Sequence, residues 1–274
     1  MIKMLKPSDM AGIGLGNFML LYGPPDTGKT HNILESLYRA KLTPILHLMG
    51  GSKGDDVDII LQKIKMKDED ITCVPLDEET VSTDLLDFLF DDEQCKPFKS
   101  IFFDDFTHHM VNTMHNEVED QHFVQKTKDG KVNMKTLAAM VKTSVENHGI
   151  VNNLTKRIFR AMGNRSKQGK VCIIATHYDE QVKWGGEFVG GPNFSGKQIG
   201  KEFIGHFGKI GRVVERFERD KDNNLVKDKN GFPNKLFPPI VYFKSDGTFI
   251  ARGGGIGLLD LGKILNVDKK KPKE

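Results

Sequence analysis

The segment 23–30, GPPDTGKT, constrains this chain more than any other feature. It fits the spacing G-x-x-x-x-G-K-[ST], which forms a loop whose backbone N–H groups surround phosphate oxygens. The flanking sequence is what such a loop requires, because the apolar run 17–22 precedes it and a helical stripe over 29–40 follows it. The segment therefore predicts a strand, a phosphate-binding loop and a helix, in that order.

Each kind of residue in this loop has a chemical role. Gly23 and Gly28 let the backbone curl so that its N–H groups converge. Lys29 is expected to neutralise charge at the β- and γ-phosphates, and the Thr30 hydroxyl is expected to ligate the accompanying Mg²⁺. We therefore expect ATP and Mg²⁺ as cofactors. The expected cofactor-binding residues are Gly23, Pro24, Pro25, Asp26, Thr27, Gly28, Lys29, Thr30 and His31.

A pair of carboxylates follows the apolar run 101–103. An aspartate at the end of a buried strand is the residue type that holds Mg²⁺ through its water shell, and we assign this role to Asp104. Asp105 is a candidate for the base that orients the attacking water. Two alternatives stay open: Asp105 caps the following helix, or Asp55 and Asp56 beyond the second strand supply the base.

The strand predicted over 171–176 supplies candidates for contact with the γ-phosphate. It ends in Thr176 and His177, and polar residues at this end of a parallel strand face the nucleotide crevice. Either residue is therefore a candidate sensor of the γ-phosphate. For His177, the alternative is a capping or core-edge histidine.

Arg212 and Arg216 are candidates for contact with a γ-phosphate. They share one face of the strand predicted over 210–218, because residues an even number apart do so. An arginine there is placed to stabilise charge that develops on a γ-phosphate. Lys209 is an alternative donor, and ordinary surface ion pairs are the alternative role.

Strand-length apolar runs alternate with helical patterns over the first 180 residues. This alternation predicts an α/β fold with a mostly parallel central sheet that has helices on both faces. Beyond about residue 210 the strands follow each other closely and are separated by turn signals, which predicts antiparallel C-terminal strands. The expected helices are 29–40, 57–64, 81–90, 107–120, 134–147 and 151–167. The expected strands are 17–22, 44–49, 71–74, 100–104, 171–176, 210–218, 239–244 and 248–252.

We expect one domain over 1–265. Its core covers about 15–220, a β-rich extension covers about 221–265, and the charged tail 266–274 is expected to be disordered.

The stretch 185–200 contains six glycines in sixteen positions, which predicts a mobile loop because each glycine costs backbone entropy. Aromatic rings beside a cation suit single-stranded DNA, since a base stacked on such a ring contributes about 1–3 kcal/mol. For the loop, the alternative roles are an active-site lid and a subunit contact. For the basic helix over 151–167, the alternative is a solvated face. The candidate DNA-binding residues are Phe188, Phe194, Lys197, Arg157, Arg160 and Arg165.

The net charge of +3 hides an uneven distribution. Residues 55–120 include 19 acidic and 5 basic side chains, whereas residues 152–219 include 13 basic and 6 acidic ones. Such a distribution favours one surface for a polyanion and another for a different partner, although two solvated helix faces of opposite sign are the alternative.

Three widely spaced cysteines without a CxxC pair fit a reducing compartment. The apolar runs are far shorter than the ~20 residues of a membrane-spanning helix, and the N-terminus lacks a secretory signal pattern. We therefore expect a cytoplasmic protein with no membrane partner.

Four blocks occur in a characteristic order: LLYGPPDTGKT, SIFFDDFTHHM, NNLTKRIFRAMGNRSKQGK leading into VCIIATHYDEQ, and GGPNFSGKQIGKEFIGHFGKIGRVVER. Over roughly 15–220 the chain resembles the phage-encoded RecA-like P-loop ATPases, some of which are associated with single-strand annealing and recombination. The resemblance implies a RecA-type core and ATP-dependent work on single-stranded DNA in the host cytoplasm. It also implies a homo-oligomer, ring or filament, whose active site is completed by a neighbour, and partners from replication or recombination.

One position departs from that pattern. RecA has a glutamate near the end of its second strand that serves the water, whereas the corresponding strand here reads HLMGG. This departure favours an alternative, a nucleotide-gated adaptor or helicase loader that hydrolyses ATP slowly and docks partners through the acidic 55–120 region. A small-molecule kinase is a further alternative, which the Gly- and Phe-rich candidate lid disfavours.

Overall fold

The computed structural model describes residues 18–51, 54–76, 82–115, 145–169, 171–194, 201–253 and 256–258. Three predictions lie wholly or mostly outside these ranges: the role of Lys197, the tail 266–274 and the helix over 134–147. The helix predicted over 107–120 is described as far as residue 115, and this part is helical.

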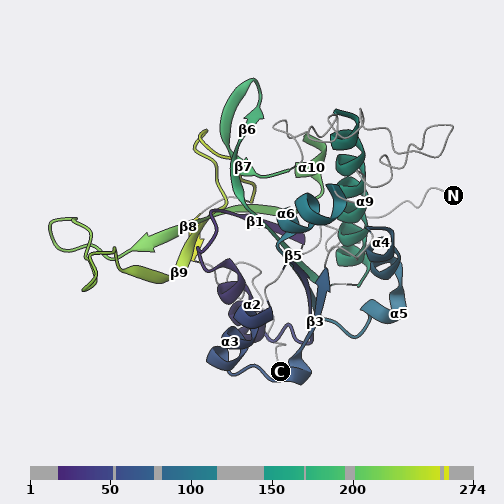
Figure 1. The fold of residues 1–274 in the computed structure, drawn as a ribbon, viewed down its shortest axis with the longest axis horizontal. Coiled ribbons are helices and arrows are strands. Elements are labelled where there is room, and N and C mark those ends of the chain that lie inside the picture. Colours follow the sequence, from purple (N-terminus) through teal and green to yellow (C-terminus); the bar gives the residue numbers. More distant parts are fainter. Residues whose placement is uncertain are drawn as a thin grey trace, which may run out of the picture.

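In the described residues an eight-stranded sheet forms the centre of the molecule (Figure 1). Its order is β10-β9-β8-β1-β5-β4-β2-β3. The strands from β8 to β3 pair in parallel, whereas β9 and β10 are antiparallel. The prediction of a mostly parallel sheet with antiparallel C-terminal strands is confirmed. The strands are β1 (Phe18–Tyr22), β2 (Ile45–Gly50), β3 (Ile71–Leu76), β4 (Ser100–Asp104), β5 (Cys172–His177), β8 (Lys209–Phe217), β9 (Lys235–Tyr242) and β10 (Ile256–Leu258).

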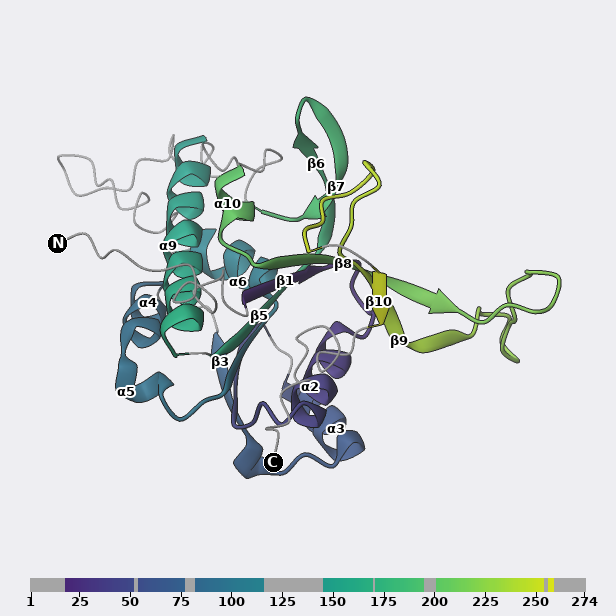
Figure 2. The same cartoon turned by 180° about the vertical axis from the view of Figure 1, so that it is seen from behind.

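Helices cover both faces of this sheet, as Figures 1 and 2 show from opposite sides. One face carries α2 (Lys29–Arg39) and α3 (Gly54–Ile64), and a short turn of 3-10 helix, η1 (Asp68–Asp70), precedes β3. The other face carries α4 (Ser82–Phe90), α5 (Asp92–Cys95), α6 (Phe106–His109) with its π-helical continuation η2 (Met110–Met114), α9 (Val145–Gly169) and α10 (Lys201–Gly205).

The pleat of β1 divides its side chains between two cores. Phe18 and Leu20 pack in the core beneath α9, whereas Met19 and Leu21 pack in the core beneath α2. All four are almost completely buried, because successive side chains of a strand point to opposite faces. The strand that leads into the phosphate-binding loop is therefore anchored from both sides of the sheet.

The glycine-rich stretch differs from the predicted mobile loop. Strand β7 (Glu187–Pro192) occupies its first half and pairs antiparallel with β6 (Asp179–Trp184). Gly185 and Gly186 form the turn between them, and both have positive φ angles. These two glycines therefore serve a tight hairpin, which stands beside the central sheet in Figure 1.

The close approach of other residues explains why strand β7 has a glycine at position 190. A Cβ atom there would lie 3.3 Å from the Cβ of Phe249 and 3.5 Å from the Cζ of Arg212. The Gly190 N–H donates to the Thr248 carbonyl, and its own carbonyl accepts from Ile250, both at 2.8 Å. Composition alone predicted flexibility at this position, but the glycine permits a close crossing of two chain segments.

Several predicted boundaries also change. The basic helix begins at Val145 rather than 151, and the strand predicted over 239–244 is β9, which begins at Lys235. No strand occupies 248–252 in the described structure; this segment forms only isolated bridges through Phe249 and Arg252. Single bridges arise because the segment crosses β7 and β8 at one point each.

Strands β8 and β9 continue beyond the sheet into an arm that projects from the body (Figure 2). Residues 218–234 form its tip, where the carboxylates of Asp220 and Asp228 each accept backbone N–H groups of the following turn. Among the helices of the described ranges, none combines the length and apolar character that a bilayer crossing requires.

The contact between β1, β8 and β9 gives a test of this packing. A Cβ at Gly211 would lie 2.5 Å from Val241 and 2.8 Å from Phe243, so Gly211→Ala should lower the free energy of unfolding by about 1–3 kcal/mol. At Gly205 a Cβ meets nothing within 4 Å, so Gly205→Ala is the matched control and should cost less than about 0.5 kcal/mol. Urea denaturation measures both, and equal stabilities would contradict the described sheet.

Candidate functional site

The loop 23–28 delivers the chain from β1 to the N-terminus of α2. Its two left-handed positions are Asp26, with φ 59°, and Gly28, with φ 75°. Gly28 is the residue that caps α2, and the first turn that follows, Lys29–Asn32, contains no acidic residue. The partial positive charge of this helix end is therefore not offset by the helix's own side chains, which favours a bound anion.

Gly23 is required for a different reason from the one the motif predicts. Its φ angle is not among the positive ones, but a Cβ at this position would lie 2.3 Å from the carbonyl oxygen of Val213 on β8. Any side chain would push the loop away from the neighbouring strand. The curl of the loop therefore depends on Asp26 and Gly28, and Gly23 allows its close packing on the sheet.

Lys29 folds back over the loop. Its Nζ donates to the carbonyl oxygens of Gly23 at 2.9 Å and Pro24 at 2.6 Å, and it lies 5.7 Å from the ring centre of Tyr178. The side chain is only 7% exposed. A buried ammonium group is thus held where the loop, α2 and the end of β5 meet.

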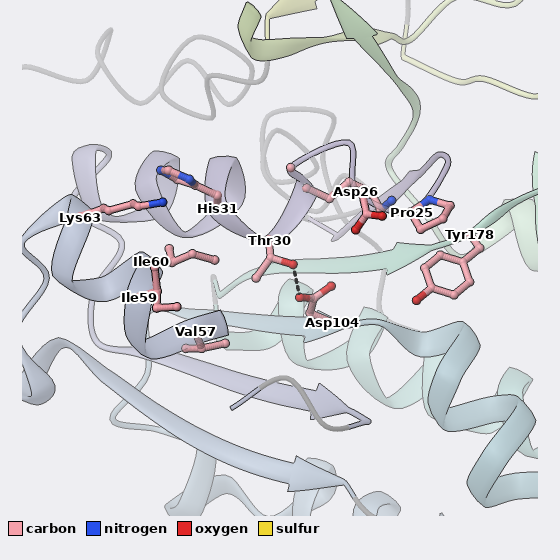
Figure 3. Close-up of a pocket in the computed structure, with 12 residues that line it drawn as sticks. Pro25, Asp26, Thr30, His31, Val57, Ile59, Ile60, Lys63, Asp104 and Tyr178 are labelled. Carbon is pink, nitrogen blue, oxygen red and sulfur yellow. Dashed lines mark hydrogen bonds between the residues drawn. The ribbon is translucent and has the colours of Figure 1, made fainter. Parts of the chain in front are cut away.

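Asp104 is the centre of the site's hydrogen bonding. Its Oδ2 accepts from the Thr30 hydroxyl at 2.5 Å (Figure 3). Its Oδ1 accepts from the Thr176 hydroxyl at 2.7 Å. The three residues come from α2, β4 and β5, so this carboxylate joins the helix to two adjacent strands. Bonds from neutral hydroxyls to a charged group are among the stronger ones in proteins, at about 1.5–3 kcal/mol each.

The Thr30 hydroxyl and the Asp104 carboxylate are oxygen donors of the type that Mg²⁺ prefers. In the described residues, this site included, no three His, Cys, Asp or Glu side chains gather as a metal site. A magnesium ion needs few protein ligands when nucleotide phosphates and water supply the others. The pair therefore fits a metal that arrives with its nucleotide.

A cavity of about 310 Å³ joins these groups (Figure 3). Tyr178 and Pro25 lie at one end, the Thr30–Asp104 pair lies in the middle, and the α3 side chains lie at the other end. This volume falls at the lower end of the range for small-molecule sites. The lining residues are Pro25, Asp26, Gly28, Lys29, Thr30, His31, Val57, Ile59, Ile60, Lys63, Asp104 and Tyr178.

Asp105 does not line this cavity. It is fully buried as the N-cap of α6, where its Oδ1 accepts the backbone N–H of His108 at 2.6 Å. This geometry is that of the capping alternative, because an aspartate at an N-cap satisfies one of the free donors of a helix. Asp55 and Asp56 lie at the start of α3, and their side chains are outside the described part.

His177 is also outside the cavity lining. Its ring lies in the core against Phe106 and Phe194, and its Nδ1 is 3.1 Å from the Thr107 hydroxyl. Burial lowers the pKa of His177 to about 3, with a small opposing effect of the Asn193 carbonyl. The position matches the core-edge alternative for this histidine.

The structure places the two candidate arginines away from the cavity. Arg212 donates from Nε and Nη2 to Asp179 at 3.1 and 2.7 Å and lies over the Phe249 ring, so it fastens β8 to the start of β6. Arg216 donates to the carbonyl of Pro238 at 3.1 Å. Both guanidinium groups have partners within their own chain.

The candidate DNA-binding residues do not form a single surface. Phe188 on β7 is 62% exposed, whereas Phe194 is 2% exposed and packs against Phe159 and Phe203. The Phe194 ring is therefore inaccessible to a base in this structure.

On α9, Arg157 and Arg160 are exposed. Arg165 instead donates to the Leu89 carbonyl from Nε and Nη2 at 3.3 and 2.9 Å, which ties α9 to α4.

Three parts of the site were not predicted from the sequence. His47 on β2 is fully buried, with its Nε2 3.9 Å from Oδ2 of Asp104; a histidine inside an otherwise apolar strand was the available signal. Tyr178, which follows the β5 candidates directly, lines the cavity. The apolar wall from α3 gave no signal, because the same residues serve equally well in a core.

No protein-family model matches the sequence, and no curated protein matches it. Among solved structures, a KaiC-like protein from the hyperthermophilic archaeon Pyrococcus horikoshii OT3 is similar in fold, with a TM-score of 0.40 and 10% sequence identity. The similarity covers 82% of this chain and 81% of that protein.

The buried histidines beside the site predict a pH dependence. Burial lowers the pKa of His177 to about 3 and that of His109 to about 4, both below their ordinary value of 6.5. Below pH 6.5 the unfolded chain therefore binds more protons than the folded one, so stability falls as the pH falls. When the pH falls from about 7.5 to about 5, each histidine should lower the free energy of unfolding by about 2 kcal/mol.

Denaturant unfolding at the two pH values measures this loss. His177→Gln removes one titrating group and should make the loss smaller by about 2 kcal/mol. An unchanged pH dependence in this variant would contradict the buried, neutral state of the ring.

Proposed function

We propose that the chain binds ATP with Mg²⁺ in the cavity between α2, α3 and the end of β5. One observation carries this proposal: the open N-terminus of α2, the buried Lys29 ammonium and the Thr30–Asp104 oxygen pair all converge on that cavity. A phosphate chain requires this combination of backbone donors, one cation and oxygen ligands for its metal.

In this proposal each residue has one task. The N–H groups at the start of α2 bind phosphate oxygens, and Lys29 exchanges its loop carbonyls for the β- and γ-phosphates. Thr30 and Asp104 hold the metal, directly and through water, while Thr176 keeps the carboxylate oriented. The bound Mg²⁺ would supply neutralisation of the charge on the phosphates.

We propose ATP hydrolysis as the reaction, with slow intrinsic turnover. The described lining includes two carboxylates: Asp26, which is exposed on the loop, and Asp104, which accepts two hydroxyl groups. Since Asp105 caps α6, no described carboxylate besides these is placed to orient a water. The same observation favours the second candidate, a nucleotide-gated adaptor or helicase loader. Phosphate release with and without single-stranded DNA distinguishes the two.

We further propose that the protein is a RecA-like ATPase that acts on single-stranded DNA, as a homo-oligomer, in phage recombination, annealing or replication in the host cytoplasm. The β6–β7 hairpin supports this, because it starts directly after Tyr178 in the cavity and presents Phe188 to solvent. Arg157 and Arg160 offer exposed cations on α9. A base stacked on Phe188 would place DNA on the β6–β7 hairpin, which begins beside the proposed nucleotide site.

Lys29→Ala tests the nucleotide proposal. Loss of the only lysine in the loop should weaken ATP–Mg²⁺ binding at least about 30-fold, since charge-assisted bonds to phosphate are about twice as strong as neutral ones. Lys41→Ala, a lysine just beyond the end of α2, is the control and should bind as the wild type does. Isothermal titration calorimetry measures both affinities. A Lys29→Ala protein that binds and hydrolyses ATP normally would refute the assignment.

Phe188→Ala tests the DNA proposal. Removal of the ring should weaken binding of an oligo(dT) strand about five- to 100-fold, as expected for one stacked base. Phe232→Ala is the matched control, because Phe232 is 68% exposed on the distant arm and should not affect binding. Fluorescence anisotropy at several salt concentrations also reports phosphate contacts, since binding should weaken as salt rises. Equal affinities of the two variants would reject a stacking role for the hairpin.

A further inference from the structure

His47 is a polar residue inside the otherwise apolar strand β2, and it is fully buried. Neither of its ring nitrogens has a hydrogen-bond partner among the described residues. Burial of a polar atom in this state costs free energy, and native proteins rarely leave one so unless it has a function. A leucine would fill the same place in the core without this cost. The histidine therefore indicates a role other than packing.

The neighbouring strand β4 fixes the plane of this ring. His47 pairs with Phe102 in the parallel register, and their rings are stacked with a centroid distance of 4.7 Å and an interplanar angle of 3°. Phe102 is itself completely buried in the core beneath α2. His47 therefore lies on the face of the sheet that carries α2, and its ring cannot turn to another acceptor without loss of the stack.

In this orientation the ring nitrogen Nε2 faces the carboxylate of Asp104. Asp104 follows Phe102 by two residues on β4 and so lies on the same face of the sheet. Its Oδ2 is 3.9 Å from Nε2 of His47. Because N–H···O bonds are about 2.7–3.2 Å long, a movement of roughly 1 Å turns this contact into a hydrogen bond. A carboxylate oxygen has more than one lone pair, so Oδ2 can accept from Thr30 and His47 together.

The sheet order shows what His47 adds to the support of Asp104. Strand β4 lies between β5 and β2. Thr176 supports the carboxylate from β5 and Thr30 supports it from α2, whereas His47 is the polar side chain that faces it from β2. In the proposed function Thr30 also ligates the metal, so one of the two hydroxyl donors of Asp104 has a second task. Residues that hold a metal-binding carboxylate in place determine metal affinity, and loss of one typically costs about 10–100-fold.

We propose that His47 is a positioning residue for Asp104, and that its Nε2–H donates to Oδ2 when Thr30 and Asp104 hold the metal of a bound nucleotide. This inference rests on the proposed function. His47 does not line the cavity, so it acts through Asp104 rather than on the ligand. The carboxylate is then held from β2 as well as from α2 and β5, and it keeps its orientation while Thr30 serves the metal.

The contribution of Mg²⁺ to ATP affinity tests this role. Calorimetric titrations of ATP with Mg²⁺ and with excess EDTA give two affinities, and their ratio measures the effect of the metal alone. His47→Leu removes the donor and should lower this ratio about tenfold, while the affinity in EDTA changes less than about twofold. His47→Gln keeps an N–H donor near the position of Nε2 and should restore the ratio to within about threefold of the wild type.

His109→Leu is the matched control. The ring of His109 is also fully buried, and neither of its nitrogens has a hydrogen-bond partner among the described residues. It packs against Phe103 and Phe106 in the core on the opposite face of the sheet, so the ratio in this variant should equal that of the wild type.

A second measurement does not depend on whether His47→Leu folds, which urea denaturation without nucleotide establishes. In the wild type, the imidazole ¹⁵N resonance of His47 Nε2 should shift when ATP and Mg²⁺ are added. It should stay in place when ATP is added with EDTA. A resonance that responds to neither addition would overturn the positioning role.

The other outcomes separate this role from packing and from the proposed function. A ratio in His47→Leu that matches the control would overturn the positioning role while the nucleotide site stands. Equal weakening with Mg²⁺ and with EDTA would overturn it too, because the substitution would then disturb the phosphate-binding loop. So would a ratio in His47→Gln as low as that in His47→Leu, since the N–H donor would then be irrelevant. If the wild type bound no ATP, or bound it no better with Mg²⁺, the proposed function itself would fail, and the role of His47 with it.

Discussion

The buried carboxylate of Asp104 is the constraint on which the site depends. It accepts hydroxyl groups from α2 and β5 while it stands at the end of β4, so one side chain sets the spacing of three elements. Burial of a carboxylate is costly unless the group is hydrogen-bonded, and each oxygen of Asp104 accepts a hydroxyl group. The same bonds align Thr30 with the loop, and the N-terminus of α2 therefore faces the cavity.

Two further features connect the site to the rest of the molecule. The chain leaves β5 through His177 and Tyr178, so the β6–β7 hairpin starts where the cavity ends. The Tyr22 hydroxyl, one residue before the loop, donates to the Ile250 carbonyl at 2.6 Å and ties β1 to the segment that crosses the hairpin. The loop is thus connected on one side to the hairpin and on the other, through Phe237, to the β8–β9 arm.

The sequence predicted what local pattern determines. Strand, loop and helix at 17–40 follow from apolar periodicity and a motif with a backbone function, and the α/β sheet follows from alternation of such units. Roles that depend on residues far apart in the sequence could not be predicted. The local sequence around Asp105 is compatible with a catalytic base and with a helix cap. His177 is neutral because Phe106 and Phe194 surround its ring. Glycine counts predicted a mobile loop where Gly190 instead permits a close crossing. The apolar wall from α3 could not be predicted, because it lines a cavity only through the packing of α3 beside α2 in the fold.

A crystal structure with Mg²⁺ and a non-hydrolysable ATP analogue tests the central claim most directly. The account predicts phosphate oxygens within hydrogen-bonding distance of the backbone N–H groups of residues 26–30. It also predicts that Lys29 Nζ leaves the Pro24 carbonyl for a phosphate, with the metal at Thr30 and Asp104. An analogue bound elsewhere, or a loop that stays empty at saturating nucleotide with Lys29 still on its carbonyls, would contradict the account.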